Sequence, residues 1–283
     1  MSIVTDTRPT APAAPARPVN SRLKVTGPRV VRSEWAKLWS LRSTWITLGL
    51  GLLFMLAFGT IGVLRYKSMS GSGQQMDPDF ASATAISLAL FGVPFSMIAL
   101  GVLGVLTTSG EYSTGMIRST LAAVPKRLPV LWSKAAVYGV IAFVVGAVGA
   151  VVAFAISSGV LSGTAKAMTF SDSGVLRSLL GVGVYLGLVG VLGVALGALL
   201  RSTAGGISAL VGAFLLVPGL MSLLPKSWRD DLTPYLPSNA GESIFALQHQ
   251  AGTLTAGAGL LVLLGWTVLA LGGAAYRLMR SDA

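Results

Sequence analysis

Cysteine is absent from the 283 residues, histidine occurs once, and only 11% of the residues are charged. Without cysteine the chain can form no disulfide, thiolate-bound zinc, iron–sulfur cluster or thiol nucleophile. The single histidine, His249, excludes sites that need two. Soluble domains carry roughly 25% charged residues. Because this chain has less than half that share, while 53% of its residues are hydrophobic, we expect a membrane protein.

Long apolar runs predict an all-α polytopic fold with six transmembrane helices. Each run is long enough, at 1.5 Å per residue, to cross about 30 Å of hydrocarbon. Arg201 interrupts the longest apolar stretch, and a charge in mid-membrane is costly, so we place a hairpin there. The predicted spans are about 44–64, 84–107, 135–161, 175–200, 206–224 and 255–276, which together make a transmembrane domain over 44–276.

The two ends of the chain predict cytoplasmic tails. Residues 1–29 contain five of the 13 prolines and few large apolar side chains, which predicts a disordered tail. The first apolar run is about 20 residues long and has no convincing cleavage site, so we expect it to remain as an anchor. Residues 277–283 form the second tail.

The distribution of charge predicts the orientation in the membrane. With a cytoplasmic N-terminus, the inner segments hold fifteen of the 21 bases and four acids, whereas the outer segments hold six of each. This is the asymmetry that the positive-inside rule describes. We expect a multi-pass plasma-membrane protein with both termini in the cytoplasm. Topology then accounts for the net charge of +11, and we expect no nucleic-acid partner.

The segment before the first span predicts an interfacial amphipathic helix over residues 30–43. Val31, Trp35, Leu38 and Trp39 follow helical spacing and form an apolar face. The charged residues of the segment lie largely on other faces. The alternative is that the tryptophans only anchor the first span at the level of the lipid headgroups.

The connection between the second and third spans, from Gly110 to Lys134, predicts a short amphipathic helix. Its apolar face would end before Pro125, because proline disfavours helical geometry in the preceding residue. Such a helix can lie at the membrane surface, where a soluble partner can push on it. An ordinary interfacial connector is the alternative. The face is formed by Met116, Ile117, Thr120, Leu121 and Val124.

The same connection contains, in order, Glu111, Gly115, Thr120, Leu121, Pro125, Arg127 and Lys134. This motif resembles that of the permeases of type-2 ABC exporters (ABC-2 type). The resemblance includes the segment Ser33-Glu34-Trp35-Ala36-Lys37-Leu38 and the six-span layout, so it covers nearly everything from residue 30 onward. Many members have a second charged residue after the first Glu, where this chain has Tyr112 and Ser113.

The resemblance implies a permease subunit that exports an unidentified substrate and binds a separate ABC ATPase through a cytoplasmic coupling helix. It also implies a homodimer, or a heterodimer with a related permease. The residues implied for coupling are Glu111, Tyr112, Gly115, Arg118, Thr120, Leu121, Pro125 and Arg127, and those of the interfacial helix are Glu34, Trp35, Lys37, Leu38 and Trp39. No phosphate-binding loop of the form G-x-x-x-x-G-K-[ST] occurs, so ATP hydrolysis would take place on the partner.

Other functions find less support in the residues. No ionisable residue lies in the middle of a predicted span, where ion-coupled carriers need one. No catalytic or metal-binding motif is present, so we expect no enzyme, cofactor or metal site. A six-helix assembly or sensory subunit without transport remains the alternative. In the fourth span, G-x-x-x-G at 183–187 and 193–197 predicts close helix packing, within one subunit or between two.

Overall fold

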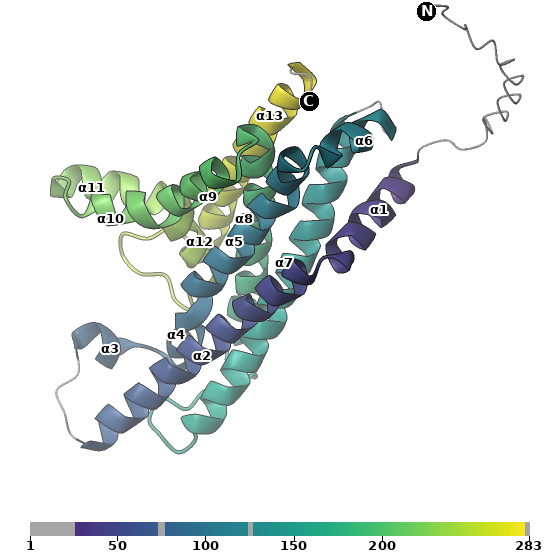
Figure 1. Cartoon of the computed structure of the whole chain (residues 1–283). Coiled ribbons are helices and arrows are strands. Elements are labelled where there is room, and N and C mark those ends of the chain that lie inside the picture. The colour runs from purple at the N-terminus through teal and green to yellow at the C-terminus, as the bar shows by residue number, and fades with distance from the viewer. Residues whose placement is uncertain (1–25, 73–76, 124–126, 281–283) are drawn as a thin grey trace, which may run out of the picture.

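The computed structural model describes residues 26–72, 77–123 and 127–280, and within these ranges it contains helices but no strand (Figure 1). Six helices are long and apolar enough to cross a membrane, which indicates a multi-pass membrane protein. They are α2 (Arg42–Ser72), α4 to α5 (Ala85–Ser113), α7 (Leu128–Val160), α8 (Val175–Leu200), α9 to α10 (Thr203–Met221) and α13 (Ala256–Arg280).

Shorter elements connect or interrupt these spans. The connecting helices are α1 (Gly27–Ser40), α3 (Pro78–Ser82), α6 (Met116–Ala123), α11 (Lys226–Leu232) and α12 (Pro237–Phe245), together with the 3-10 turn η3 (Thr233–Tyr235). The second span consists of α4 (Ala85–Ala89), the 3-10 turn η1 (Leu90–Gly92) and α5 (Val93–Ser113). The fifth consists of α9 (Thr203–Val211), the π-helical turn η2 (Gly212–Leu216) and α10 (Val217–Met221).

Most helices continue beyond the apolar runs that predict them. The first span was expected over 44–64 but α2 continues to Ser72, and α1 begins at Gly27 rather than at residue 30. Polar residues can extend a helix beyond the lipid, so apolar length gives a lower bound on helix length. The predicted tails over 1–29 and 277–283 are wrong where the structure describes them, because residues 27–29 begin α1 and residues 277–280 end α13. Residues 1–25 and 281–283 lie outside the described residues.

Helix α8 lies at the centre of the bundle and packs closely against α5 and α7. In its most apolar window 72% of the residues are buried. Small residues permit this approach: a Cβ atom on Gly197 would lie 2.6 Å from the carbonyl oxygen of Val105, and one on Gly183 would lie 2.9 Å from that of Phe143. The two G-x-x-x-G motifs therefore serve packing within one subunit.

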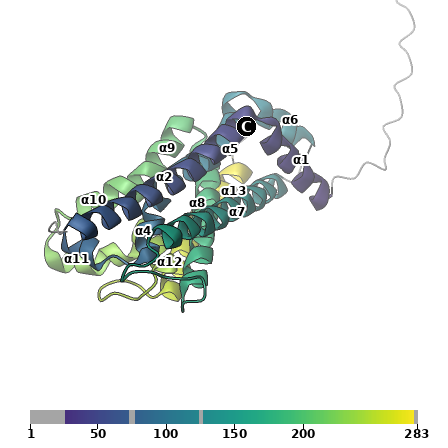
Figure 2. The same cartoon turned by 90° about the horizontal axis from the view of Figure 1, so that it is seen from below.

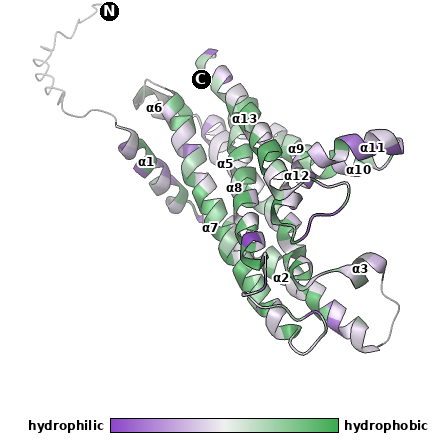
Figure 3. Ribbon diagram, turned by 180° about the vertical axis from the view of Figure 1, so that it is seen from behind, coloured by the Kyte–Doolittle hydropathy of each residue, from purple (hydrophilic) through white to green (hydrophobic). Residues whose placement is uncertain are grey.

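The fifth span leaves the bundle. Helices α9 to α11 extend sideways at a steep angle to α8, and α12 returns to pack against α8 and α13 (Figures 1 and 3). Only 17% of the apolar window of this span is buried, and Leu216 and Leu220 are 60% and 57% exposed. The π-turn η2 ends two residues before Pro218, which cannot donate a backbone hydrogen bond within the helix.

Different helices and connections lie at the two ends of the bundle. The end called here the terminal end contains α1, α6 and the last turn of α13 (Figure 1). The opposite end, called the loop end, contains α3 and the connection 161–174. Seen from below, α1 and α6 again lie side by side (Figure 2). The two helices that the sequence predicts on one side of the membrane are thus neighbours in space.

Candidate functional site

Four charged side chains from three helices form one cluster at the terminal end. This charge cluster consists of Glu34 and Lys37 on α1, Glu111 on α5 and Lys134 on α7. Lys134 Nζ lies 2.5 Å from Glu34 Oε2 and 2.9 Å from Glu111 Oε1. Lys37 Nζ lies 2.7 Å from Glu34 Oε1 and 3.0 Å from Glu111 Oε1. Each ammonium group therefore bridges both carboxylates.

The cluster is nearly shut off from solvent. Glu34 is 1% exposed, Glu111 4% and Lys134 5%, whereas the side chain of Lys37 is 29% exposed. Buried charges are tolerated where they are paired and hydrogen-bonded, and here two positive and two negative groups cancel. Glu111 Oε2 is buried without a hydrogen-bond partner. One acceptor position of the cluster is thus left unused.

The sequence of α1 explains how its acid becomes buried. Pro28 occupies the first turn, where a missing N–H costs least. Val30, Glu34 and Leu38 recur every four residues and form the buried face of the helix. The predicted apolar face is therefore divided, because Leu38 packs inward while Val31 and Trp35 are exposed. A charged residue occupies the buried face because partners on α5 and α7 neutralise it.

A tight turn joins the cluster to α6. Glu111 lies in the last turn of α5, and Gly115 follows with φ = +71°, a conformation that residues with a Cβ adopt only at a cost. Helix α6 then begins at Met116 and brings the hydroxyl of Thr120 within 3.4 Å of Lys37 Nζ. This contact joins α6, in the connection between the second and third spans, to α1, which precedes the first span.

The pKa of Lys37 is raised above its ordinary value. Burial alone would lower it, but the hydrogen bond to Glu34 and the charges of Glu34 and Glu111 outweigh the burial. Lys37 thus remains protonated throughout the physiological range. Lys37 therefore acts as a permanent cation that bridges the two carboxylates.

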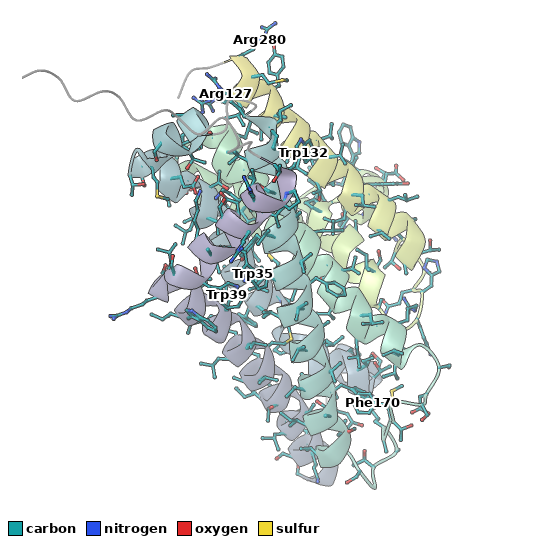
Figure 4. All side chains as sticks on the ribbon, turned by 90° about the vertical axis from the view of Figure 1, so that its right-hand side faces the viewer. Trp35, Trp39, Arg127, Trp132, Phe170 and Arg280 are labelled. Atoms are coloured by element: carbon teal, nitrogen blue, oxygen red, sulfur yellow. The ribbon has the colours of Figure 1, made fainter. Side chains whose placement is uncertain are left out.

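A second group of contacts ties the terminal end to α13. The guanidinium of Arg127 donates to the carbonyl oxygen of Leu278 at 3.3 Å, and that of Arg277 donates to Leu199. Arg201 lies over the ring of Tyr112, with 5.2 Å from its guanidinium carbon to the ring centre. Figure 4 shows Arg127 at the end where α13 finishes with Arg280. Tyr112 and Arg127 therefore belong to these contacts and not to the charge cluster.

The predicted site residues fall into three groups. Glu34, Lys37, Glu111 and Thr120 come together, and Gly115 forms the turn between them. Trp35 is exposed on α1, whereas Trp39 is partly buried and packs against the core of the bundle. Arg118 and Leu121 lie on α6, but their side chains are outside the described part of the structure, as is the whole of Pro125.

Lys134 is the member of the charge cluster that the sequence does not predict as a site residue. It forms part of the motif behind the family resemblance, but no local pattern assigns it a partner, since Glu34 is 100 positions away. The signal that could have identified it is its position: a lysine lies at the edge of a long apolar run, where a buried charge requires a neutralising acid.

Comparisons with known proteins give no match for this chain, either among protein-family models or among curated proteins. Within the described residues, no group of three or more His, Asp or Glu side chains could hold a metal ion.

Proposed function

We propose that this chain is the transmembrane permease subunit of an ABC exporter, which moves its substrate with ATP hydrolysed by a separate ATPase. The observation that carries the proposal is the charge cluster, which ties α1 and α6 to the end of α5 and the start of α7. Helix α6 is short, and it exposes Met116 (44%) while burying Ile117 (6%). A soluble partner that pushes on α6 would therefore move α5, α7 and α1 together.

In this proposal Glu111 is a positioning residue. Its carboxylate is enclosed by two lysines, so its part is to hold α6 at a fixed place relative to α1 and α7 rather than to contact the ATPase. The exposed side of α6 is left for the partner. The cytoplasmic placement of the terminal end and its location in the plasma membrane belong to the same proposal, supported by the positive-inside asymmetry of the sequence.

The proposal includes assembly with a second permease, identical or related. Its support is the fifth span, which leaves the bundle with little of its apolar surface covered. Lipid can cover such a surface as well as a second subunit can. The mass of the complex in native mass spectrometry distinguishes the two, since a single permease copy in an active complex would contradict dimerisation.

Purification in a mild detergent tests the ATPase partnership. We expect an ABC ATPase to copurify, with an ATP hydrolysis rate that changes when the permease is present. A chain that purifies alone after gentle extraction, with no nucleotide-binding companion, would contradict the proposal and favour a membrane assembly or sensory subunit.

Two hydroxyl variants of α6 test the coupling route. Thr120→Val removes the contact to Lys37, whereas Ser119→Ala removes only a bond from the side chain to the carbonyl of Met116, a bond that Thr120 also makes. We expect Thr120→Val to leave the ATPase bound while it reduces the permease-dependent change in hydrolysis at least about fivefold, a usual size for coupling between sites. Equal behaviour of the two variants would remove the cluster from the coupling route.

A further inference from the structure

The outward side of α1 carries a stripe of apolar and aromatic side chains. Val31 and Trp35 are 42% and 46% exposed, although both lie next to residues that are almost fully buried. Trp35 packs against Trp39 with ring centres 5.4 Å apart, and Trp39 packs against Trp45 at 4.4 Å. The indole N–H of Trp45 donates to the carbonyl oxygen of Trp39. The three rings therefore form one continuous stack across the junction of α1 and α2, in which Trp35 and Trp45 are exposed and Trp39 between them is partly buried.

Exposed cations border this tryptophan surface. Arg32 lies three residues before Trp35, which places it beside that ring on the helix, and Arg42 lies three residues before Trp45 on α2. Both arginines are exposed. The only acid of α1, Glu34, is turned inward and neutralised by Lys37 and Lys134. The outer side of α1 consequently presents positive charge with no carboxylate of its own helix nearby.

We propose that this surface, formed by Val31, Arg32, Trp35, Trp39, Arg42 and Trp45, binds anionic phospholipid headgroups, and that this binding holds α1 docked against the bundle. Tryptophan rings favour the headgroup level, and arginine beside them favours a negatively charged leaflet. Because Glu34 and Lys37 lie on the same helix, undocking α1 would open the charge cluster. The lipid composition thus sets how much of the protein has a complete cluster.

Charge complementarity distinguishes this occupant from a neutral bilayer. A helix anchored by tryptophan alone would dock equally in neutral and anionic lipid. Each arginine near an anionic surface strengthens binding by roughly fivefold, so two arginines make about a 25-fold difference. The inference rests on the membrane placement of the bundle but not on the ATPase partnership.

Hydrogen exchange in nanodiscs tests the inference. The chain is reconstituted in phosphatidylcholine alone and in phosphatidylcholine mixed with phosphatidylglycerol, and exchange is followed for the amides of residues 30–40. We expect exchange in α1 to slow by roughly 25-fold in the anionic discs, and this slowing to fade at high salt. Equal exchange in the two lipids would overturn the proposal. If that equal exchange were slow, tryptophan anchoring alone would be sufficient to dock α1.

Paired variants assign the effect to the proposed surface. Arg32→Gln with Arg42→Gln should remove most of the lipid dependence. Arg65→Gln with Arg229→Gln removes the same charge elsewhere, from exposed Arg65 at the loop end of the same helix α2 and from partly exposed Arg229 on α11, and should keep the dependence. Loss of the dependence in both pairs would overturn the proposal. Because no ATPase is present, this outcome is independent of the coupling experiments.

Discussion

The charge cluster at the terminal end and the cations at the loop end use different acceptors. In the cluster, two lysines meet two buried carboxylates. At the loop end, Lys67 donates to the carbonyl oxygen of Val160 at 2.8 Å, Lys166 to that of Ala81 at 2.6 Å and Arg177 to that of Ala246 at 2.6 Å. Val160 ends α7, where unpaired carbonyls and the helix dipole attract cations.

The difference lies in what remains after one partner is lost. A carbonyl at an exposed helix end can bond to water instead, so losing its cation costs little. A buried carboxylate has no such replacement and keeps its desolvation cost. The terminal end should therefore depend strongly on each member of the cluster, whereas the loop end should tolerate the loss of a single cation.

Lys134→Met should have the largest effect. It leaves two buried carboxylates with Lys37 as the only cation, and we expect the free energy of unfolding to fall by about 3–5 kcal/mol. Denaturant titration in detergent measures this change. Adding Glu34→Gln to the variant should recover part of the loss, because one negative charge remains for one positive charge. Wild-type stability in Lys134→Met would show that water already hydrates the cluster.

Lys37→Met should have a smaller effect. Its side chain is 29% exposed, and both carboxylates keep Lys134 as a partner after the substitution. We expect a loss of about 1 kcal/mol, near the upper range for a partly screened ion pair. The same titration applies, with Arg65→Met at the loop end of α2 as the control for removing a positive charge outside the cluster and the tryptophan surface. A loss as large as that of Lys134→Met would mean that the two lysines are equivalent.

Arg177→Met should act locally. Arg177 donates to Ile244, Ala246 and Leu247 at the end of α12, and its side chain is exposed. Water can donate to these carbonyl oxygens instead, so we expect the free energy of unfolding to fall by about 0.5–1 kcal/mol. Hydrogen exchange should accelerate in residues 237–247 and remain unchanged in α5 and α8. Acceleration throughout the bundle would show that the loop end, too, is essential for the global fold.

The number and approximate positions of the six spans could be predicted from the sequence, because each span contains an apolar run long enough to cross the membrane. The long extension of α2 could not, since it depends on polar residues beyond the lipid. The same limit applies to the fifth span, whose apolar run gives its length but not its direction away from α8.

The candidate site could be predicted one helix at a time. Glu34 and Lys37 belong to one short segment, Glu111 and Thr120 to another, and each segment has a recognisable amphipathic pattern. The contact between the two segments depends on tertiary packing, because it requires α1 to pack against α7. Periodicity identified an apolar face on α1 but placed Glu34 outside it, because a pattern rule treats an acid as exposed and cannot register a buried partner 100 positions away.

The smallest effect expected is a pH dependence of opposite sign at the two ends. Against the effect of burial, the hydrogen bond to Glu34 and the charges of Glu34 and Glu111 raise the pKa of Lys37 in the folded protein, so its stabilisation is complete below about pH 10.5 and is lost as the pH rises through the raised value. Burial lowers the pKa of Lys166, so the cost of its charge is greatest at neutral pH and falls as the pH approaches 10.5.

We therefore expect the stability difference between wild type and Lys37→Met to shrink at strongly alkaline pH. The difference between wild type and Lys166→Met should instead move in favour of wild type between neutral pH and 10.5. Unfolding transitions of the three proteins across this range measure both changes, and a shift of the same sign for both lysines would contradict the assignment of carboxylates to one end and carbonyls to the other.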